Sequence, residues 1–300
     1  SVFFPKRLQG TALGIQAGLG NFGVSLTQFV TPWIISFAAA GAFFGPAQTF
    51  TKGALTKEIW LQNAAFWYVP PLLVLTVIAW MFLRRVPVRA SFREQLDIFS
   101  NKHTYYCTAT YVMTFGAFSG LAAVFPLLIR LVYGKFDNPP DPLAYAFYGP
   151  LIGSAMRVLW GPLTDKFGGA IFTQLCGFGL IAGCATLVFG GLLTPTSVDQ
   201  FPWFVGVMLA MFLFTGIGNA ATFRQYPVVF SQSPRQAAGV IGFTAAIAAY
   251  GPFLFSALLG WSKSASGTFN AFFIGLSAYC ALATAINWWF YARRGAEKPS

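Results

Sequence analysis

The sequence predicts an all-α polytopic membrane protein. Hydrophobic residues make up 56% of the 300 residues and charged residues only 9%, whereas a soluble domain carries about 25% charged residues. Apolar runs of roughly 20 residues, long enough to cross the hydrocarbon core of a bilayer, recur along the chain. Short connections rich in Pro, Gly and charge separate these runs. No segment has the alternating pattern of a β-strand, and no soluble domain is expected.

Taken in order, the apolar runs give eight membrane spans. They are 10–40, 64–83, 105–132, 143–163, 169–193, 203–223, 237–260 and 269–291. Lys and Arg gather in alternate connections, and such residues favour the cytoplasmic side of a membrane. Both chain ends, the 84–102 loop, TDKFGG and SQSPRQ are therefore expected in the cytoplasm. This accounts for the net charge of +11 without a nucleic-acid partner.

The 84–102 loop is the longest and most basic cytoplasmic connection, and six expected spans follow it. That order is typical of the second half of a 6+6 transporter. We expect residues 1–83 to hold the last two helices of the first half, 84–104 a central cytoplasmic loop, and 105–300 the six-helix second half. The chain opens on SVFFPKRLQG, which reads as a loop already in progress, so four further spans are expected before it.

The first span contains QAGLGNFGVSLTQ, residues 16–28, where glycines and amides interrupt an apolar run. On a helix, one face collects Gly10, Gly14, Ala17, Asn21, Ser25 and Gln28. Tight helix packing explains the glycines and Ser25. It explains Asn21 less well, because an amide within a membrane needs hydrogen-bond partners. We expect the glycines to allow close approach to a neighbour or ligand, and Asn21 to offer its NH₂ to an oxyanion.

Arg157 is a charged residue expected within a span, about 9 Å from the cytoplasmic end of its helix. It could snorkel to the headgroups, or it could face an aqueous cavity or anion path. Its small neighbours Gly149, Gly153 and Ser154 would leave room around it, which favours the second interpretation. No Asp, Glu, His or Lys is expected in the middle of a span. The simplest counter-ion for Arg157 is therefore a transported anion.

Tyr111 and Phe115 are spaced i, i+4 near the middle of the first span after the basic loop. A phenol there needs a hydrogen-bond partner, which could be a structural group or a ligand.

The rest of the chain has few residues that could bind a metal or take part in catalysis. The four cysteines fall within apolar runs and there is one histidine, His103, so no metal site is expected. Since no nucleophile–base pair or cofactor motif is visible, neither an enzyme nor a bound cofactor is expected.

GPLTDKFGG, residues 161–169, resembles the cytoplasmic loop motif of the major facilitator superfamily. In that superfamily the motif follows the second span of each half, which is its place here. The resemblance implies the superfamily's fold, with this chain equivalent to its last eight helices. It also implies a gating or structural role on the cytoplasmic side for the motif residues Gly161, Asp165, Lys166, Gly168 and Gly169.

Within the superfamily, ALGIQAGLGNFGVSLTQ resembles the signature of the nitrate/nitrite porters, the NarK-like transporters, and FFPKRLQG before it also matches. TYVMTFGAFSG, YAFYGPLIGSAMR, GIGNAATF and VIGFTAAIAAYGPF resemble further segments of that family, although Ala248 and Ala249 stand where its second signature has glycines. The resemblance implies that these segments bind the substrate through Arg157, Asn21, Tyr111, Phe115, Gly18, Gly20 and Ser25. It also implies a second arginine from spans not included in this sequence.

The expected function is exchange of nitrate and nitrite by alternating access, by a monomer in the bacterial inner membrane. Bound anion would offset the charge of the arginines, so loaded forms would interchange and empty ones would not. A proton-coupled nitrate symporter is the alternative, although no carboxylate is expected in mid-span here. An anion channel, a membrane-embedded enzyme and another solute carrier of the superfamily are the remaining alternatives.

Overall fold

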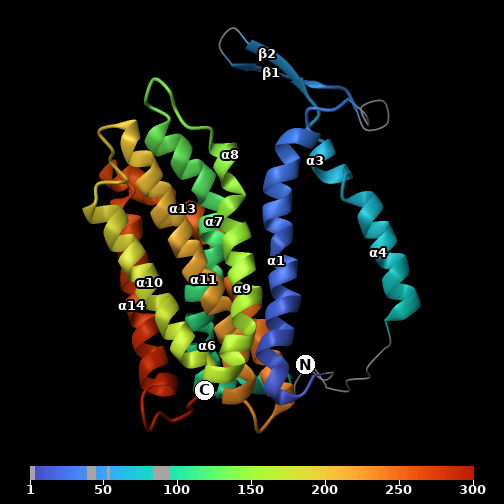
Figure 1. Cartoon of the computed structure of the whole chain (residues 1–300), viewed down its shortest axis with the longest axis vertical. Helices are drawn as coiled ribbons and strands as arrows, with labels where there is room; N and C mark the ends of the chain where they lie inside the picture. Colours follow the sequence, from blue (N-terminus) through green and yellow to red (C-terminus); the bar gives the residue numbers. More distant parts are fainter. Residues whose placement is uncertain (1–3, 39–44, 53–54, 84–94) are drawn as a thin grey trace. The chain divides into compact units, whose positions relative to one another are not determined.

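The computed structural model describes residues 4–38, 45–52, 55–83 and 95–300. By contact the chain divides into two compact units, one of Ser1–Ser25 with Phe92–Ser300 and the other of Leu26–Ser91. Figure 1 shows the predominantly helical course of both units, which agrees with the predicted fold class. The predicted division into 1–83, 84–104 and 105–300 stays a prediction, and residues 84–94 of its central loop lie outside the described residues.

The long helix α1, Gln9–Ile34, follows a short turn η1, Lys6–Leu8. Its residues up to Ser25 belong to the larger unit, where it packs against α9, Tyr148–Phe167 (Figure 1). A Cβ atom on Gly14 would lie 3.0 Å from the carbonyl oxygen of Arg157 and 3.3 Å from the Cα of Gly161. Both neighbours are backbone atoms that cannot move aside. The packing interpretation of the glycines is therefore confirmed at this contact.

The first span after the basic loop is one long element built from four pieces. They are α6 Lys102–Tyr111, η3 Val112–Gly116, α7 Ala117–Leu128 and η4 Ile129–Tyr133. The turns η3 and η4 are π-helical, a form that holds one residue more per hydrogen-bonded ring than the α-helix and is frequent at functional sites. The π turn η3 begins directly after Tyr111 and includes Phe115, so it lies at the predicted aromatic pair.

The remaining helices of the larger unit follow the predicted order. They are η2 Leu96–Ser100, α8 Pro142–Ala146, α10 Gly169–Phe189, η5 Val198–Gln200, α11 Phe201–Val229, α12 Pro234–Ala248, α13 Gly251–Ser266, α14 Asn270–Asn287 and η6 Trp288–Ala292. Between α9 and α10 the chain turns at Gly168, whose φ of +87° favours glycine. The core is aromatic, and Gly149 and Gly153 on α9 make room for the rings of Phe212 and Phe118.

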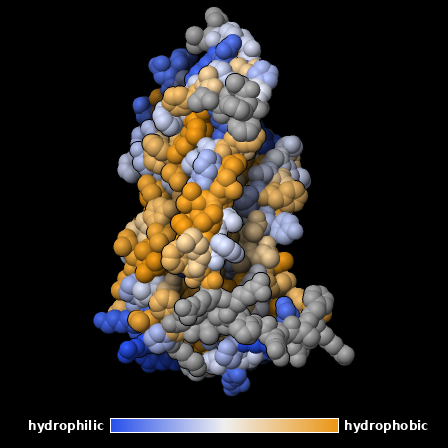
Figure 2. Space-filling model, turned by 90° about the vertical axis from the view of Figure 1, so that its right-hand side faces the viewer, coloured by the Kyte–Doolittle hydropathy of each residue, from blue (hydrophilic) through white to orange (hydrophobic). Residues whose placement is uncertain are grey.

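Six helical segments of the described chain are long and apolar enough to cross a membrane. They are Asn63–Phe82, Lys102–Tyr133, Gly169–Phe189, Val198–Val229, Pro234–Ser266 and Asn270–Ala292. Helices α1 and α9 occupy the other two predicted spans but are less apolar, because α1 carries glycines and amides and α9 carries Arg157. The face in Figure 2 is mainly hydrophobic along its middle, with hydrophilic residues toward the ends.

The smaller unit corrects the expectation that no segment forms a strand. Strands β1 Gln48–Lys52 and β2 Leu55–Ile59 pair antiparallel, with Gln48 opposite Ile59. Each strand has only five residues, which is too short for alternation to stand out in a polar connection. The unit continues with α3 Asn63–Phe66 and α4 Val69–Phe82. Asn63 satisfies carbonyl groups at the C-terminal end of α1. Its Nδ2 donates to the carbonyl oxygens of Ile34 and Phe37, at 3.3 and 2.7 Å.

Replacing Gly14 with Val should separate α1 from α9, because the added atoms would overlap the backbone of Arg157 and Gly161. We expect a melting temperature lower by roughly 3–10 °C, the effect of an overpacked contact. Gly20→Val on the same helix is the control, since no atom lies within 4 Å of a Cβ there. Equal melting temperatures of the two variants in detergent would contradict the close packing of α1 and α9.

Candidate functional site

Arg157 lies at the centre of the candidate site. Its side chain is buried, with 1% of its surface exposed, so it does not snorkel to the headgroups. Nη2 donates to the Tyr111 hydroxyl at 3.4 Å, and Nε has no hydrogen-bond partner among the described residues. No carboxylate of the described chain pairs with it. The guanidinium is therefore a buried cation without a protein counter-ion, and such a group is costly to hold.

Aromatic rings surround this guanidinium. Its Cζ lies 4.4 Å from the ring centroid of Phe223 and 5.9 Å from that of Phe115, within the range of cation–π attraction. The ring of Tyr111 stacks between them, 5.3 Å from Phe115 and 5.2 Å from Phe223. Three elements, α6, η3 and α11, thus supply a stack of rings beside one cation on α9.

Phe223 is a site residue that the sequence analysis missed. It ends the segment GIGNAATF, which was recognised as similar to a family segment but gave no individual residue. The chain has 34 Phe residues, so one ring carries little information by itself. Its distance from Arg157 along the sequence hides the contact. Only the packing of α9 against α11 brings the two residues together.

Of the substrate-binding residues predicted on α1, some pack against α9 and one lies beside open space. A Cβ on Gly18 would lie 2.6 Å from Val158 Cγ2 on α9, and Ser25 Oγ donates to the carbonyl oxygen of Phe147 at 2.9 Å. Helix packing explains both residues, and their contact with an anion stays a prediction. Gly20 is exposed and has open space beside it.

The side-chain amide of Asn21 has a hydrogen-bond donor that no described residue accepts from. Its Nδ2 is buried and has no hydrogen-bond partner among the described residues. One helical turn earlier, Ala17 packs against the cluster that contains Tyr111 and Phe223, and residues four apart share a helix face. Asn21 therefore lies on the face of α1 that is turned toward this cluster. No hydrogen bond joins it to Arg157 in the described structure.

The second glycine-rich segment of the family approaches the site despite Ala248 and Ala249. A Cβ on Gly251, at the start of α13, would lie 2.4 Å from the carbonyl oxygen of Gly116. Gly116 ends the π turn that carries Phe115. The close backbone approach at the site is thus retained at Gly251.

At the other end of α9, Asp165 of the loop motif ties three helices together. Its Oδ1 accepts from the backbone N–H of Gly10 at 2.8 Å, and Oδ2 accepts from the N–H and the hydroxyl of Thr11, each at 2.7 Å. Arg224 Nε on α11 lies 3.0 Å from Oδ1. A carboxylate at the first turn of α1 satisfies free amides and opposes the positive end of the helix dipole.

Two glycines of the motif serve the same junction. Gly161 allows the close approach of α1, since a Cβ there would lie 3.1 Å from the Gly10 carbonyl oxygen, and Gly169 packs against α11. Lys166 Nζ lies 5.1 Å from the ring centroid of Phe167. These contacts are structural, and the gating role of the motif stays a prediction.

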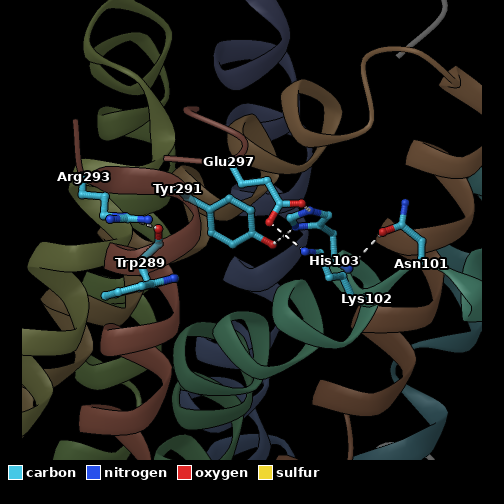
Figure 3. Close-up of polar contacts among 7 residues, drawn as sticks. All are labelled: Asn101, Lys102, His103, Trp289, Tyr291, Arg293 and Glu297. Atoms are coloured by element: carbon cyan, nitrogen blue, oxygen red, sulfur yellow. Dashed lines mark hydrogen bonds and ion pairs between the residues drawn. The ribbon is translucent and has the colours of Figure 1, made fainter. Parts of the chain in front are cut away.

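A separate polar cluster holds the only histidine of the chain (Figure 3). The buried His103 places Nδ1 3.0 Å from the Tyr291 hydroxyl and Nε2 3.2 Å from Glu297 Oε1. Lys102 Nζ donates to Glu297 Oε2 at 2.8 Å, and this hydrogen bond holds the pKa of Glu297 below its ordinary value. The cluster joins the start of α6 to the segment after η6. In the described part of the chain, no group of ligating side chains could hold a metal ion.

Comparison with known proteins identifies clear relatives. The chain is 58% identical over 300 residues to the probable nitrate/nitrite antiporter NarK2 of Thermus thermophilus, covering all of this chain and 67% of that protein. It is 35% identical over 318 residues to the nitrate/nitrite transporter NarU of Escherichia coli, covering 98% of this chain and 66% of that protein. The chain thus spans about two thirds of the length of these relatives. No protein-family model matches it.

Replacing Asp165 with Asn should loosen the junction of α1, α9 and α11. The change removes the charge that faces Arg224 and one acceptor for the amides of α1. We expect a loss of about 1–2 kcal/mol, typical of a helix cap with a partly buried ion pair.

Thermal unfolding in detergent measures this loss, with Asp199→Asn as the control because Asp199 is exposed on the turn η5 and its carboxylate contacts only the nearby Ser197 hydroxyl among the hydrogen bonds described. In a double-mutant cycle, Asp165→Asn and Arg224→Gln should be non-additive. Simple additivity would show that the two side chains do not act together.

Proposed function

We propose that this chain, which belongs to the nitrate/nitrite porter family of the major facilitator superfamily, exchanges nitrate for nitrite across the bacterial inner membrane. The observation that carries the proposal is the buried guanidinium of Arg157, which lacks a protein counter-ion in the described structure. The names of the relatives supply the two anions. The protein acts as a monomer, by alternating access.

The site suits a small planar oxyanion. A guanidinium is planar and always charged, and its fork of N–H groups matches two oxygens of one anion. Arg157 and the Tyr111 hydroxyl donate to the anion, and the free Nδ2 of Asn21 donates from α1. Phe115 and Phe223 present flat apolar faces, which exclude water and strengthen these charge-assisted hydrogen bonds.

One-for-one exchange follows from the free energy needed to close the site when no anion is bound. Closing the protein around a bare guanidinium leaves a cation buried without a partner, which is strongly unfavourable. A bound anion removes that cost, so the loaded protein changes its open side and the empty protein does not. The contact of α1 with α9 takes part in this change because Asn21 and Arg157 lie on these two helices. After an anion leaves on one side, another must bind from that same side before the site can turn back, so transport is a one-for-one exchange.

The assay for exchange uses liposomes that contain the protein and are loaded with nitrite. We expect uptake of ¹⁵N-labelled nitrate only into loaded vesicles, independent of a pH gradient. Uptake into empty vesicles driven by external acid would replace the proposal with proton symport. Current without any internal anion would indicate a channel.

Replacing Arg157 with Lys should reduce exchange about 100-fold, because a point charge lacks the fork and loses about 3 kcal/mol of charge-assisted hydrogen bonding. Arg130→Lys is the matched control, since Arg130 is exposed on η4 and outside the aromatic cluster. Near-normal uptake by folded Arg157→Lys protein would refute the role of Arg157.

A further inference from the structure

Asn219 on α11 is a buried amide that the proposed mechanism does not use. None of its surface is exposed, and within the described structure neither Nδ2 nor Oδ1 has a hydrogen-bond partner. Asn287, another buried asparagine, donates to the Ala170 carbonyl oxygen at 2.9 Å and to Gln174 Oε1 at 2.8 Å. Buried amides are ordinarily satisfied in this way, because an unpaired one is costly. Asn219 is therefore an exception, and a bound ligand would supply the missing hydrogen-bond partner.

The neighbours of Asn219 on α11 show which way it faces. Gly216 packs against Gly153 on α9, and Gly218 faces both Cys176 on α10 and Thr114 on the π turn η3. On a helix with 100° per residue, position 219 points between these two directions. Phe223, one turn later on the same face, covers the guanidinium of Arg157. The amide thus shares a helix face with Phe223, on the side of the candidate site.

Ser154 adds a second unused group on the facing helix. It lies one turn before Arg157 on α9, is fully buried, and its Oγ has no hydrogen-bond partner in the described residues. Arg157 Nε is also unpaired. These three side chains offer more N–H and O–H donors than acceptors. A ligand that satisfies them must bring oxygen acceptors, as an oxyanion does.

We infer that Asn219, supported by Ser154, donates to the third oxygen of nitrate and so distinguishes nitrate from nitrite. The inference rests on the proposed function. The fork of Arg157 engages two oxygens, which both anions possess. Nitrate has one more oxygen, and nitrite has a lone pair at that position. That lone pair is a weaker and more distant acceptor than the third oxygen of nitrate, and a site built to donate a hydrogen bond discriminates against a ligand that accepts it poorly.

The test replaces Asn219 with Leu, which keeps the volume and removes the donor. Uptake of labelled nitrite is measured in nitrite-loaded liposomes while unlabelled nitrate or nitrite competes outside. We expect the half-inhibiting concentration of nitrate to rise about 5- to 10-fold, as for a lost hydrogen bond, and that of nitrite to change less than about 2-fold. The Ser154→Ala variant should shift the same ratio to a smaller extent.

Asn287→Leu is the matched control, because it removes an amide that the protein already satisfies. It should lower the melting temperature and leave the nitrate-to-nitrite ratio unchanged, whereas Asn219→Leu should not lower the melting temperature. An unchanged ratio, or equal loss of both anions, in Asn219→Leu would overturn the inference. If wild-type protein exchanges neither anion, the proposed function fails and the inference fails with it.

The wild-type protein provides a second readout should Asn219→Leu not fold. Nitrate should raise the melting temperature of wild type more than nitrite does at equal concentration, and Ser154→Ala should reduce that difference. Equal shifts by the two anions would also overturn the inference, because the third oxygen would then contribute nothing.

Discussion

The cost of burying the positive charge of Arg157 governs the candidate site. Water or a carboxylate ordinarily compensates a guanidinium, and the described structure gives this one a phenol and the faces of two rings. Ring faces attract a cation but leave its N–H donors free. The site is thus charged, buried and short of acceptors within the described structure. These properties would suit a small oxyanion better than a neutral solute, as the proposed function requires.

The packing around Arg157 depends on small residues at a few positions. Gly14 and Gly161 bring α1 against α9, Gly216 brings α11 against α9, and Gly251 brings α13 against the π turn. Without side chains at these contacts, the helix backbones come close enough for the long side chains between them to meet. A membrane supplies no hydrophobic force between helices, so close backbone packing carries much of the stability. The same glycines therefore stabilise the bundle and define the space around the guanidinium.

Much of this arrangement could be predicted from the sequence, because a membrane leaves the chain few choices. Helices occupy all eight predicted positions, and Arg157, Tyr111 and Phe115 lie together. Hydropathy is weakest at α1 and α9, since glycines, amides and charged residues, the candidate site residues among them, replace apolar ones there. The hairpin of β1 and β2 escaped prediction because its strands are short and polar. Phe223 and Asn219 also escaped it, because whether a ring or an amide has a partner depends on α9 and η3, which are distant in sequence.

The π turn between Tyr111 and Gly116 gives the aromatic stack a means of rotation. A π turn holds one residue more than an α turn, so a shift of that residue along the span would change the winding at each position it passed. When it passes a given position, the side chain there rotates by about 100° about the helix axis. Such a step would swing Phe115 away from Tyr111 while the flanking helices α6 and α7 remained intact. A local change of winding would thus alter one side of the cation's surroundings and leave the contact with Phe223 in place.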